Sequence, residues 1–288
     1  MLRSLSIAAA LCLMASSVGA QDVVGRNAAV KGTVSIASQG EEARQAVIKE
    51  DVRLQDEVTS ALDSSLQVLL LDETVFTVGP EARLTIDRFV YDPSRADGQL
   101  SATVKSGMFR FMSGKTARAS RDAVSIDTPV ASLGVRGTVV EGLVGRDAIA
   151  LARQLGLVDP SVPLDPDGAT LFVLRGPGPA KNSRDRRGEI EVSTRVGAVT
   201  LNQPGQAVFV ANRDTLPSRP IRMTLAQLSL FDDRLRTEPG LGPSFRPFDV
   251  DVDLPRRKRR LDPVAEPFDP LADLDWPEAD VFGGECPC

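Results

Sequence analysis

Hydrophobic and polar residues alternate along most of the chain between residues 46 and 144, which is the pattern of half-buried β-strands. The clearest alternating segments are Asp51–Ser60, Leu84–Tyr91 and Val124–Asp127. Glycine, proline and aspartate interrupt such segments at intervals of about 8–12 residues, a spacing typical of β-sandwiches and barrels. We therefore predict an all-β fold with a sandwich or jelly-roll-like arrangement. Regular repetition of strands and turns also permits a short β-solenoid.

Predicted strands continue on both sides of these segments. They lie at Val30–Ile36, Leu66–Leu71, Thr74–Val78, Leu100–Lys105, Met108–Phe111, Thr170–Leu174, Ile190–Thr194, Ala198–Leu201 and Ala207–Val210. Ser106-Gly107 is expected to turn the chain between two of them. We accordingly divide the chain into an N-terminal strand segment at 21–45, a β core at 46–144, and additional strands of the same domain at 170–222.

Two segments have a helical period instead. Residues 146–155 place their apolar side chains on one stripe, and Gly156 ends the pattern. With the loop that follows, this helix is predicted to form a small insertion at 145–169. A second amphipathic helix is predicted at Leu225–Leu235, within a C-terminal helical segment at 223–237.

Residues 238–288 differ from the rest in composition, because proline recurs among aspartates and branched aliphatic residues are scarce. Such a segment buries too little apolar surface to offset the entropy of ordering, so we predict a disordered tail. Aspartates flank its basic run Arg256–Arg260, which we interpret as a solvated charge block rather than a lipid-binding patch. Cys286 and Cys288 are expected to form a disulfide; binding of a soft metal and pairing between chains are the alternatives.

The segment Val124–Val140 contains apolar runs separated by a proline corner and a glycine corner. Thr128-Pro129 stops the first strand, because proline has no N–H to donate to a sheet. Gly134 and Gly137 are expected to supply backbone positions with positive φ or with no room for a Cβ atom. We expect Arg136, the charged residue between them, to anchor the corner to a carboxylate. An exposed recognition role is the alternative.

This corner resembles the signature end of the FecR domain, in which a Thr-Pro pair is followed by Gly-x-Arg-Gly-Thr. The matching residues are Thr128, Pro129, Gly134, Arg136, Gly137 and Thr138. Phe89–Pro93 and Gly107–Phe111 are also similar to that domain. The resemblance covers residues 46–144, with a looser continuation from 170 to about 220.

The resemblance implies a role in the cell envelope. FecR-domain proteins are best known as regulators that relay an outer-membrane signal to a cytoplasmic sigma factor, using an N-terminal anti-sigma segment and a membrane helix. This chain has neither in its sequence. It begins with a short positive segment, Met1-Leu2-Arg3, followed by an apolar run at Leu5–Val18 and a small-residue site ending at Ala20. These features predict a signal peptide at 1–20, cleaved near Ala20.

The apolar run is too short to cross a membrane, and no other stretch is long enough. We therefore expect an exported protein with no transmembrane segment after cleavage. The periplasm is the expected location, and secretion to the extracellular medium is the alternative. The expected partner is another envelope protein.

Composition argues against several classes of function. The chain has no histidine, which removes Ser-His-Asp and Cys-His catalysis and histidine-containing zinc sites. Its formal net charge of −5 argues against nonspecific nucleic-acid binding. Asp165 and Asp167 form half of a calcium-loop pattern, but the other ligands are missing, and we interpret the stretch as a turn.

No residue is therefore assigned to catalysis, to a metal or to a cofactor. We predict a non-catalytic module that senses or adapts within the envelope by binding another protein. A structural or adhesive surface module is the alternative. A carboxylate-based carbohydrate-active enzyme is a weaker one, because no pair of acids stands in a recognisable glycosidase context.

Overall fold

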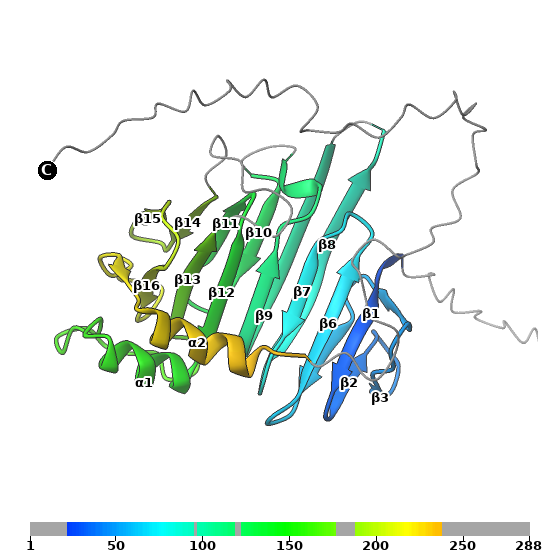
Figure 1. Ribbon diagram of the computed structural model, residues 1–288, viewed down its shortest axis with the longest axis horizontal. Helices are drawn as coiled ribbons and strands as arrows, with labels where there is room; N and C mark the ends of the chain where they lie inside the picture. The colour runs from blue at the N-terminus through cyan, green and yellow to red at the C-terminus, as the bar shows by residue number, and fades with distance from the viewer. Residues whose placement is uncertain (1–21, 95–96, 119–121, 177–187, 238–288) are drawn as a thin grey trace, which may run out of the picture. The chain divides into compact units, whose positions relative to one another are not determined.

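Two β layers make up most of the fold, and the chain passes from one to the other several times (Figure 1). The computed structural model describes residues 22–94, 97–118, 122–176 and 188–237, all of which belong to one compact unit. The predicted signal peptide, the tail at 238–288, Arg256–Arg260, Cys286 and Cys288 lie outside these residues.

Each layer is a row of nine strands that includes β9. The first layer contains, in spatial order, β4 (Asp51–Arg53), β1 (Val23–Lys31), β6 (Ser65–Leu70), β7 (Val75–Val78), β9 (Asp97–Met112), β12 (Val139–Val144), β13 (Thr170–Gly176), β16 (Gln206–Val210) and β17 (Ile221–Arg222). The second contains β3 (Arg44–Gln45), β2 (Val34–Ala37), β5 (Glu57–Ser60), β8 (Arg83–Asp92), β9, β10 (Val124–Asp127), β11 (Ser132–Arg136), β14 (Glu189–Ser193) and β15 (Ala198–Leu201).

Strand β9 belongs to both layers and joins them into one mixed sheet. Its first half pairs with β8 and β10, and its second half pairs with β7 and β12. The bend lies at Gly107, whose φ is 78° and where a Cβ atom would overlap the backbone of Ala82. The predicted turn at Ser106-Gly107 is therefore wrong: the chain bends there without reversing, so two predicted strands are one.

The inner faces of the two layers enclose the main hydrophobic core. Phe76 and Phe111 of the first layer pack edge to face with ring centroids 4.9 Å apart. Leu100 and Leu133 belong to the same buried cluster and come from the second layer. Neighbouring strands are antiparallel except for the parallel pair β9–β10, and no described pairing closes the sheet. The all-β sandwich prediction is confirmed, and the parallel coils of a β-solenoid are absent from the described chain.

Two helices lie on the outer face of the first layer (Figure 1). Helix α1 (Arg146–Gln154) follows β12 and buries Ala148, Ile149 and Ala152, which confirms the predicted helical insertion. Helix α2 (Leu225–Arg234) confirms the predicted C-terminal helix and begins with a capping box between Thr224 and Gln227. No helix in the described ranges is long and apolar enough to cross a membrane.

Local backbone geometry explains two further differences from the predicted strands. Asp51–Ser60 was expected to alternate as one segment, but it is divided into β4 and β5, and Gln55 between them has φ of 65°. Val30–Ile36 was expected to be one strand, but the chain turns at Gly32 between β1 and β2. Gly32 has φ of 69°, and a Cβ atom at this position would overlap the side chain of Ser64. A glycine bend that carries the chain from β1 in the first layer to β2 in the second therefore replaces the uninterrupted strand. A short 3-10 turn, Thr116–Arg118, follows β9.

Candidate functional site

The proline corner closes the hairpin between β10 and β11. The Thr128 backbone N–H donates to the carbonyl oxygen of Ala131 at 2.8 Å, and its hydroxyl donates to the same oxygen at 3.0 Å. Pro129 occupies the turn, where no ladder hydrogen bond is needed. Its carbonyl oxygen accepts from Arg213 at 3.0 Å. The strand thus ends at Thr128-Pro129 as predicted.

The two glycines of the corner differ in their environments. Gly137 has φ of 57°, a conformation that favours glycine, while no heavy atom lies within 4 Å of a Cβ atom built on it. Gly134 lies inside β11 without positive φ, and a Cβ atom would be 3.9 Å from the nearest atom, the carbonyl oxygen of Glu191. Positive φ is confirmed for Gly137. The prediction that Gly134 needs to be glycine is wrong, because an ordinary side chain fits there.

Arg136 is the exposed last residue of β11. Alternation along this strand buries Val135 in the core and turns Arg136 outward. Within the part of the chain that the structure describes, Arg136 makes no side-chain hydrogen bond or ion pair. No described residue supplies the predicted carboxylate anchor, and the Arg136 side chain is exposed.

Thr138 is the buried polar anchor of the corner. Its hydroxyl donates to the carbonyl oxygen of Gly176 at 2.6 Å, and its backbone N–H donates to Oγ of Ser113 at 3.0 Å. The Ser113 hydroxyl donates in return to the Thr138 carbonyl oxygen at 2.8 Å. Through its side chain and backbone, Thr138 thus links the residue after β9, the start of β12 and the end of β13.

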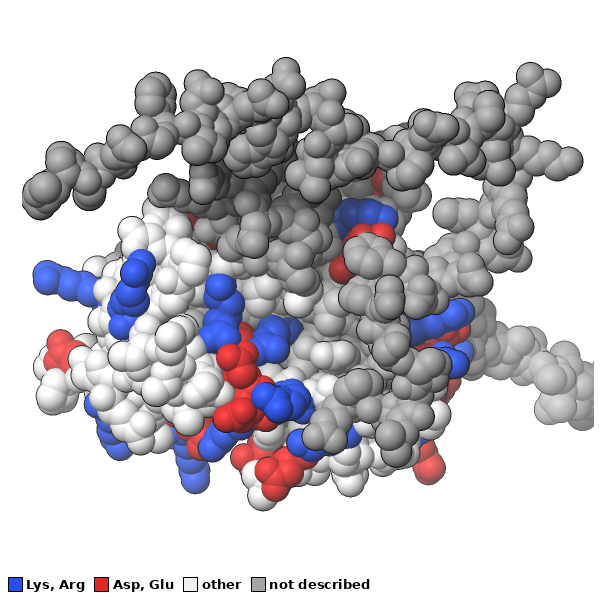
Figure 2. Space-filling view, viewed as in Figure 1, with Lys and Arg blue, Asp and Glu red and all other residues white. Residues whose placement is uncertain are grey.

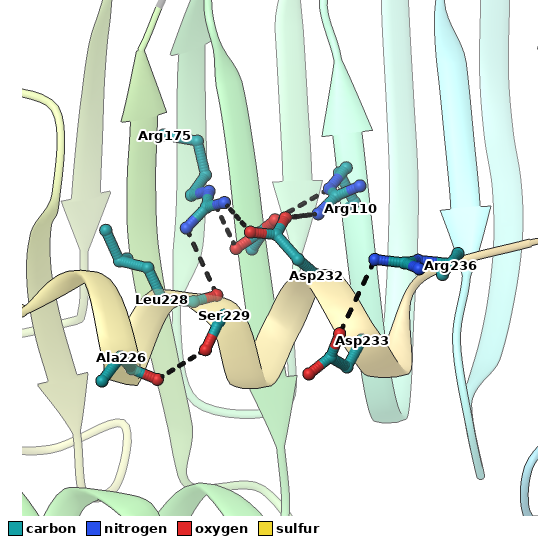
Figure 3. Close-up of polar contacts among 9 residues, drawn as sticks. Arg110, Arg175, Ala226, Leu228, Ser229, Asp232, Asp233 and Arg236 are labelled. Atoms are coloured by element: carbon teal, nitrogen blue, oxygen red, sulfur yellow. Dashed lines mark hydrogen bonds and ion pairs between the residues drawn. The ribbon is translucent and has the colours of Figure 1, made fainter.

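An ion cluster that the sequence did not predict lies on the outer face of the first layer (Figure 3). Its centre is Glu141 of β12, which is fully buried. Arg110, opposite Glu141 on β9, donates from Nε to Glu141 Oε1 at 2.7 Å. Arg175 of β13 places Nε 3.4 Å from Glu141 Oε2. Two guanidinium groups from neighbouring strands therefore flank one buried carboxylate.

Helix α2 supplies the fourth charge of the cluster, Asp232 (Figure 3). Its two carboxylate oxygens accept from Arg110 at 2.7 Å and from Arg175 at 2.6 Å. Arg175 also donates to the carbonyl oxygen of Leu228 at 3.4 Å. The cluster is therefore neutral as a whole and attaches α2 to β9 and β13.

Burial raises the pKa of Glu141, and the positive charges of Arg110 and Arg175 act in the opposite direction. Glu141 Oε2 makes no hydrogen bond to any described residue, although it lies within ion-pair distance of Arg175. Leaving a buried carboxylate oxygen without a hydrogen bond weakens the stabilisation that an ion pair gives. The arrangement holds a helix in place and has no free acid or base for chemistry.

The calcium-loop residues lie away from this cluster, in the loop before β13. The Asp165 carboxylate accepts the backbone N–H groups of Asp167 and Gly168 at 3.1 and 2.9 Å. Asp165 therefore stabilises its own turn. The described ranges contain no group of three or more residues that could together hold a metal ion.

Charges are mixed on the face of the molecule that carries α2. Lysine and arginine side chains lie next to aspartate and glutamate side chains instead of forming a patch of one sign (Figure 2). Exposed pairs such as Arg234 with Asp147, at 3.2 Å, also connect α2 to α1. Electrostatic attraction at this face is therefore local and depends on individual pairs.

Comparisons with known proteins agree with the sequence motif. Residues 56–158 match the family model described as FecR protein. Two crystal structures of a putative anti-sigma factor from Parabacteroides distasonis, at 1.65 and 2.50 Å resolution, are similar at 14% identity, with TM-scores of 0.36 and 0.37. Each alignment covers 60% of this chain and 62% of that one, so it spans somewhat less than two thirds of their length.

A search of curated proteins found no match. The family match contains the whole signature corner, helix α1 and two members of the ion cluster, Arg110 and Glu141. The other two members, Arg175 and Asp232, come from later in the chain. The chain therefore carries a FecR domain at residues 56–158.

Proposed function

We propose that the protein is a non-catalytic, exported adaptor of the cell envelope that recognises a protein partner through the outer face of its second layer. The observation that supports this proposal is the position of Arg136. It is the charged residue of the signature corner, it is exposed, and it has no partner in the described part of the chain. An arginine that is not used inside the fold is available to a ligand.

The chemistry of the guanidinium group favours a carboxylate on the partner. Arginine presents five N–H donors in a planar fork that matches a carboxylate with two parallel hydrogen bonds. Gly137, beside it, leaves open space where a side chain would stand. Hydroxyl-bearing residues such as Ser125 and Ser132 line the same outer face, which no described helix covers (Figure 1). A polar face that carries an exposed arginine without a described partner suits an acidic group on a protein surface.

Export is part of the proposal and rests on the sequence of residues 1–20. We expect the protein purified from an envelope fraction to begin near Gln21. N-terminal sequencing measures this directly. Retention of Met1 on the mature protein would contradict export by a cleaved signal peptide.

Partner recognition is tested with the Arg136→Ala variant. Tagged wild-type protein is used to capture its partner from an envelope extract, and the partner is identified by mass spectrometry and then purified. Arg136→Ala should lose at least tenfold in affinity for the purified partner, which is typical of removing one well-placed charged contact. Its urea midpoint should stay unchanged, because the side chain makes no described contact.

Arg219→Ala is the matched control, since Arg219 is also exposed and lies in the loop before β17 of the other layer. This variant should bind the partner as the wild type does. Full binding by Arg136→Ala would exclude the second-layer face as the recognition surface. A lowered urea midpoint would show that Arg136 has a structural role instead.

A further inference from the structure

The segment Thr224–Thr237, which we call the strap, crosses the outer face of the first layer (Figure 1). It consists of α2 and a short extension that ends beside Ser65 of β6, with the two hydroxyl oxygens of Ser65 and Thr237 3.2 Å apart. On the way it passes Gly79, where a Cβ atom would come within 2.7 Å of Leu235. The first layer is therefore shaped to receive this segment.

Three side chains of the strap are buried, and Asp232 and Arg234 add ion pairs to neighbouring elements. Phe231 is the buried residue of α2, and Leu235 is buried just beyond it. Leu225, by contrast, is 86% exposed. The capping box at Thr224 satisfies the first N–H groups of the helix from within the strap, so the helix begins without help from the sheet. The strap is thus a helix that caps its own N-terminus and packs on the sheet through one side.

The face under the strap combines apolar surface with an unbalanced charge. Apolar side chains of the sheet and of α1 form the cluster that receives Phe231 and Leu235; they include Met108, Leu143, Ile149, Leu171, Val173 and Phe209. In the middle, Arg110 and Arg175 share the single carboxylate of Glu141. Without Asp232, one of the two half-buried guanidinium groups would lack a counter-charge. The face therefore requires an acid from whatever covers it.

The strap shows which chemistry meets this requirement. Its contacting residues Leu228, Phe231, Asp232 and Leu235 stand at positions i, i+3, i+4 and i+7 of a helical pattern. This is the spacing of anchors in peptides that bind as a helix in a groove. The specific element is an acid that directly follows an aromatic anchor.

We infer that the face beneath the strap is a docking site for an amphipathic helix of a partner protein, and that the strap competes with this helix for the site. The partner helix carries the same pattern as the strap: two aliphatic anchors, one aromatic anchor and an acid. The partner helix binds when the strap leaves. Binding is weakened by the fraction of time for which the strap is closed, because the ligand sees only the open molecules. This site is on the opposite layer from Arg136 and does not depend on the proposed adaptor function.

The probe for this site is a labelled synthetic peptide of residues 224–237, titrated into the full-length mature protein and followed by fluorescence anisotropy. Asp232→Asn in the protein removes the charge that pairs with Arg110 and Arg175, so the open fraction should rise. We expect the peptide to bind Asp232→Asn at least about tenfold more tightly than it binds the wild type. A peptide that itself carries Asp232→Asn should bind at least about tenfold more weakly than the unmodified peptide to the same variant.

Asp233→Asn is the matched control. Asp233 is the next residue, its side chain is 74% exposed, and its ion pair is with Arg236 of the strap itself, at 3.8 Å (Figure 3). This variant should bind the peptide as weakly as the wild type does. Hydrogen exchange on the same proteins should show faster exchange of 225–235 in Asp232→Asn, with the core strands unchanged.

A disulfide between Ser65→Cys and Thr237→Cys, in a background with Cys286→Ser and Cys288→Ser, provides the opposite test by locking the strap closed. The oxidised protein should not bind the peptide, and a reductant should restore binding.

Failure of the peptide to bind Asp232→Asn would overturn the inference. Equal rates of hydrogen exchange in the strap and the core strands would also overturn it, since the strap would then be a fixed part of the fold. Peptide binding to the locked protein would place the site elsewhere. If Asp232→Asn formed a concentration-dependent dimer in which each strap binds the other molecule, the helix that occupies the site would come from a second copy of this chain. That result would overturn the inference of a partner protein.

Discussion

At the scale of single residues, the two glycines of the signature corner have opposite requirements. Gly137 has φ of 57°, whereas Gly134 has an extended backbone and room for a side chain. Both were predicted to need glycine, because sequence spacing cannot distinguish a residue inside a strand from one that turns it. Backbone dihedral angle is the deciding property, and it depends on where the strand ends.

Replacing each glycine with valine tests this difference. Gly137→Val should lower the free energy of unfolding by about 1–3 kcal/mol, the range for a residue held in an unfavourable backbone conformation. Gly134→Val should change it by less than about 1 kcal/mol, because a β-branched residue suits a half-buried strand position with room for a side chain. Urea denaturation at equilibrium measures both. Equal destabilisation by the two substitutions would be inconsistent with this assignment.

Glu141 gives a prediction about pH. Burial raises its pKa above the ordinary value of 4.5, so the native protein holds a proton at pH values where the unfolded chain has released it. The resulting stability is fully present below the pKa of the unfolded chain and is lost as the pH rises through the native pKa. The free energy of unfolding of the wild type, relative to Glu141→Gln, should therefore increase as the pH is lowered from about 7 toward 4.5.

Chemical denaturation of the two proteins across this pH range measures the difference. The substitution keeps the size of the side chain and removes its titration, so other ionisable groups cancel in the comparison. A difference that decreases on acidification would mean that Arg110 and Arg175 outweigh burial and lower the pKa instead.

At the scale of elements, the sequence predicts the positions of strands and helices better than it predicts the contacts between them. Period-two alternation located β8 and β10 correctly, and a helical stripe located α1. The ion cluster could not be predicted in this way, because Arg110, Glu141 and Arg175 are far apart in sequence and become neighbours only through strand register. The available signal was weaker: Glu141 is a lone acid inside an apolar strand, which indicates a buried charge that needs a partner.

The bend in β9 also depends on tertiary structure and gives a prediction of its own. Gly107 and Gly40 have the same φ of 78°, but only Gly107 lies against another segment, the backbone near Ala82. Gly107→Ala should therefore lower the free energy of unfolding by more than about 3 kcal/mol, since steric overlap adds to the backbone strain. Gly40→Ala carries only the strain and should lower it by about 1 kcal/mol.

Urea denaturation of both variants measures this difference. The comparison isolates the effect of the neighbouring segment, because the two glycines have the same φ. Similar losses at both positions would show that the contact with the Ala82 segment relaxes easily, and that the two layers do not depend on a close approach at the bend.

At the scale of the whole molecule, the two layers differ in what covers them. Strands β13 and β16 are buried on both faces, and their sequences are correspondingly continuous apolar runs without alternation. That lack of alternation agrees with the cover that α1 and α2 provide on the outer face of these strands. Strands β10 and β11 alternate, and their outer face is polar and carries neither of the two described α-helices. The pattern of the sequence thus distinguishes the covered layer from the open one.

Two truncations test how much of the C-terminal region the fold requires. Removing residues 238–288 should change the free energy of unfolding by less than about 1 kcal/mol, because their composition predicts few buried contacts. Removing residues 224–288 also deletes the strap and should lower it by about 3–5 kcal/mol, the usual loss for a buried phenylalanine side chain. Both truncated proteins should unfold in one cooperative transition, because the core between the layers is built without the strap. Equal stability of the two truncated proteins would mean that the strap contributes nothing to the fold. A large loss of unfolding free energy on removing residues 238–288 alone would show that the tail packs against the folded core.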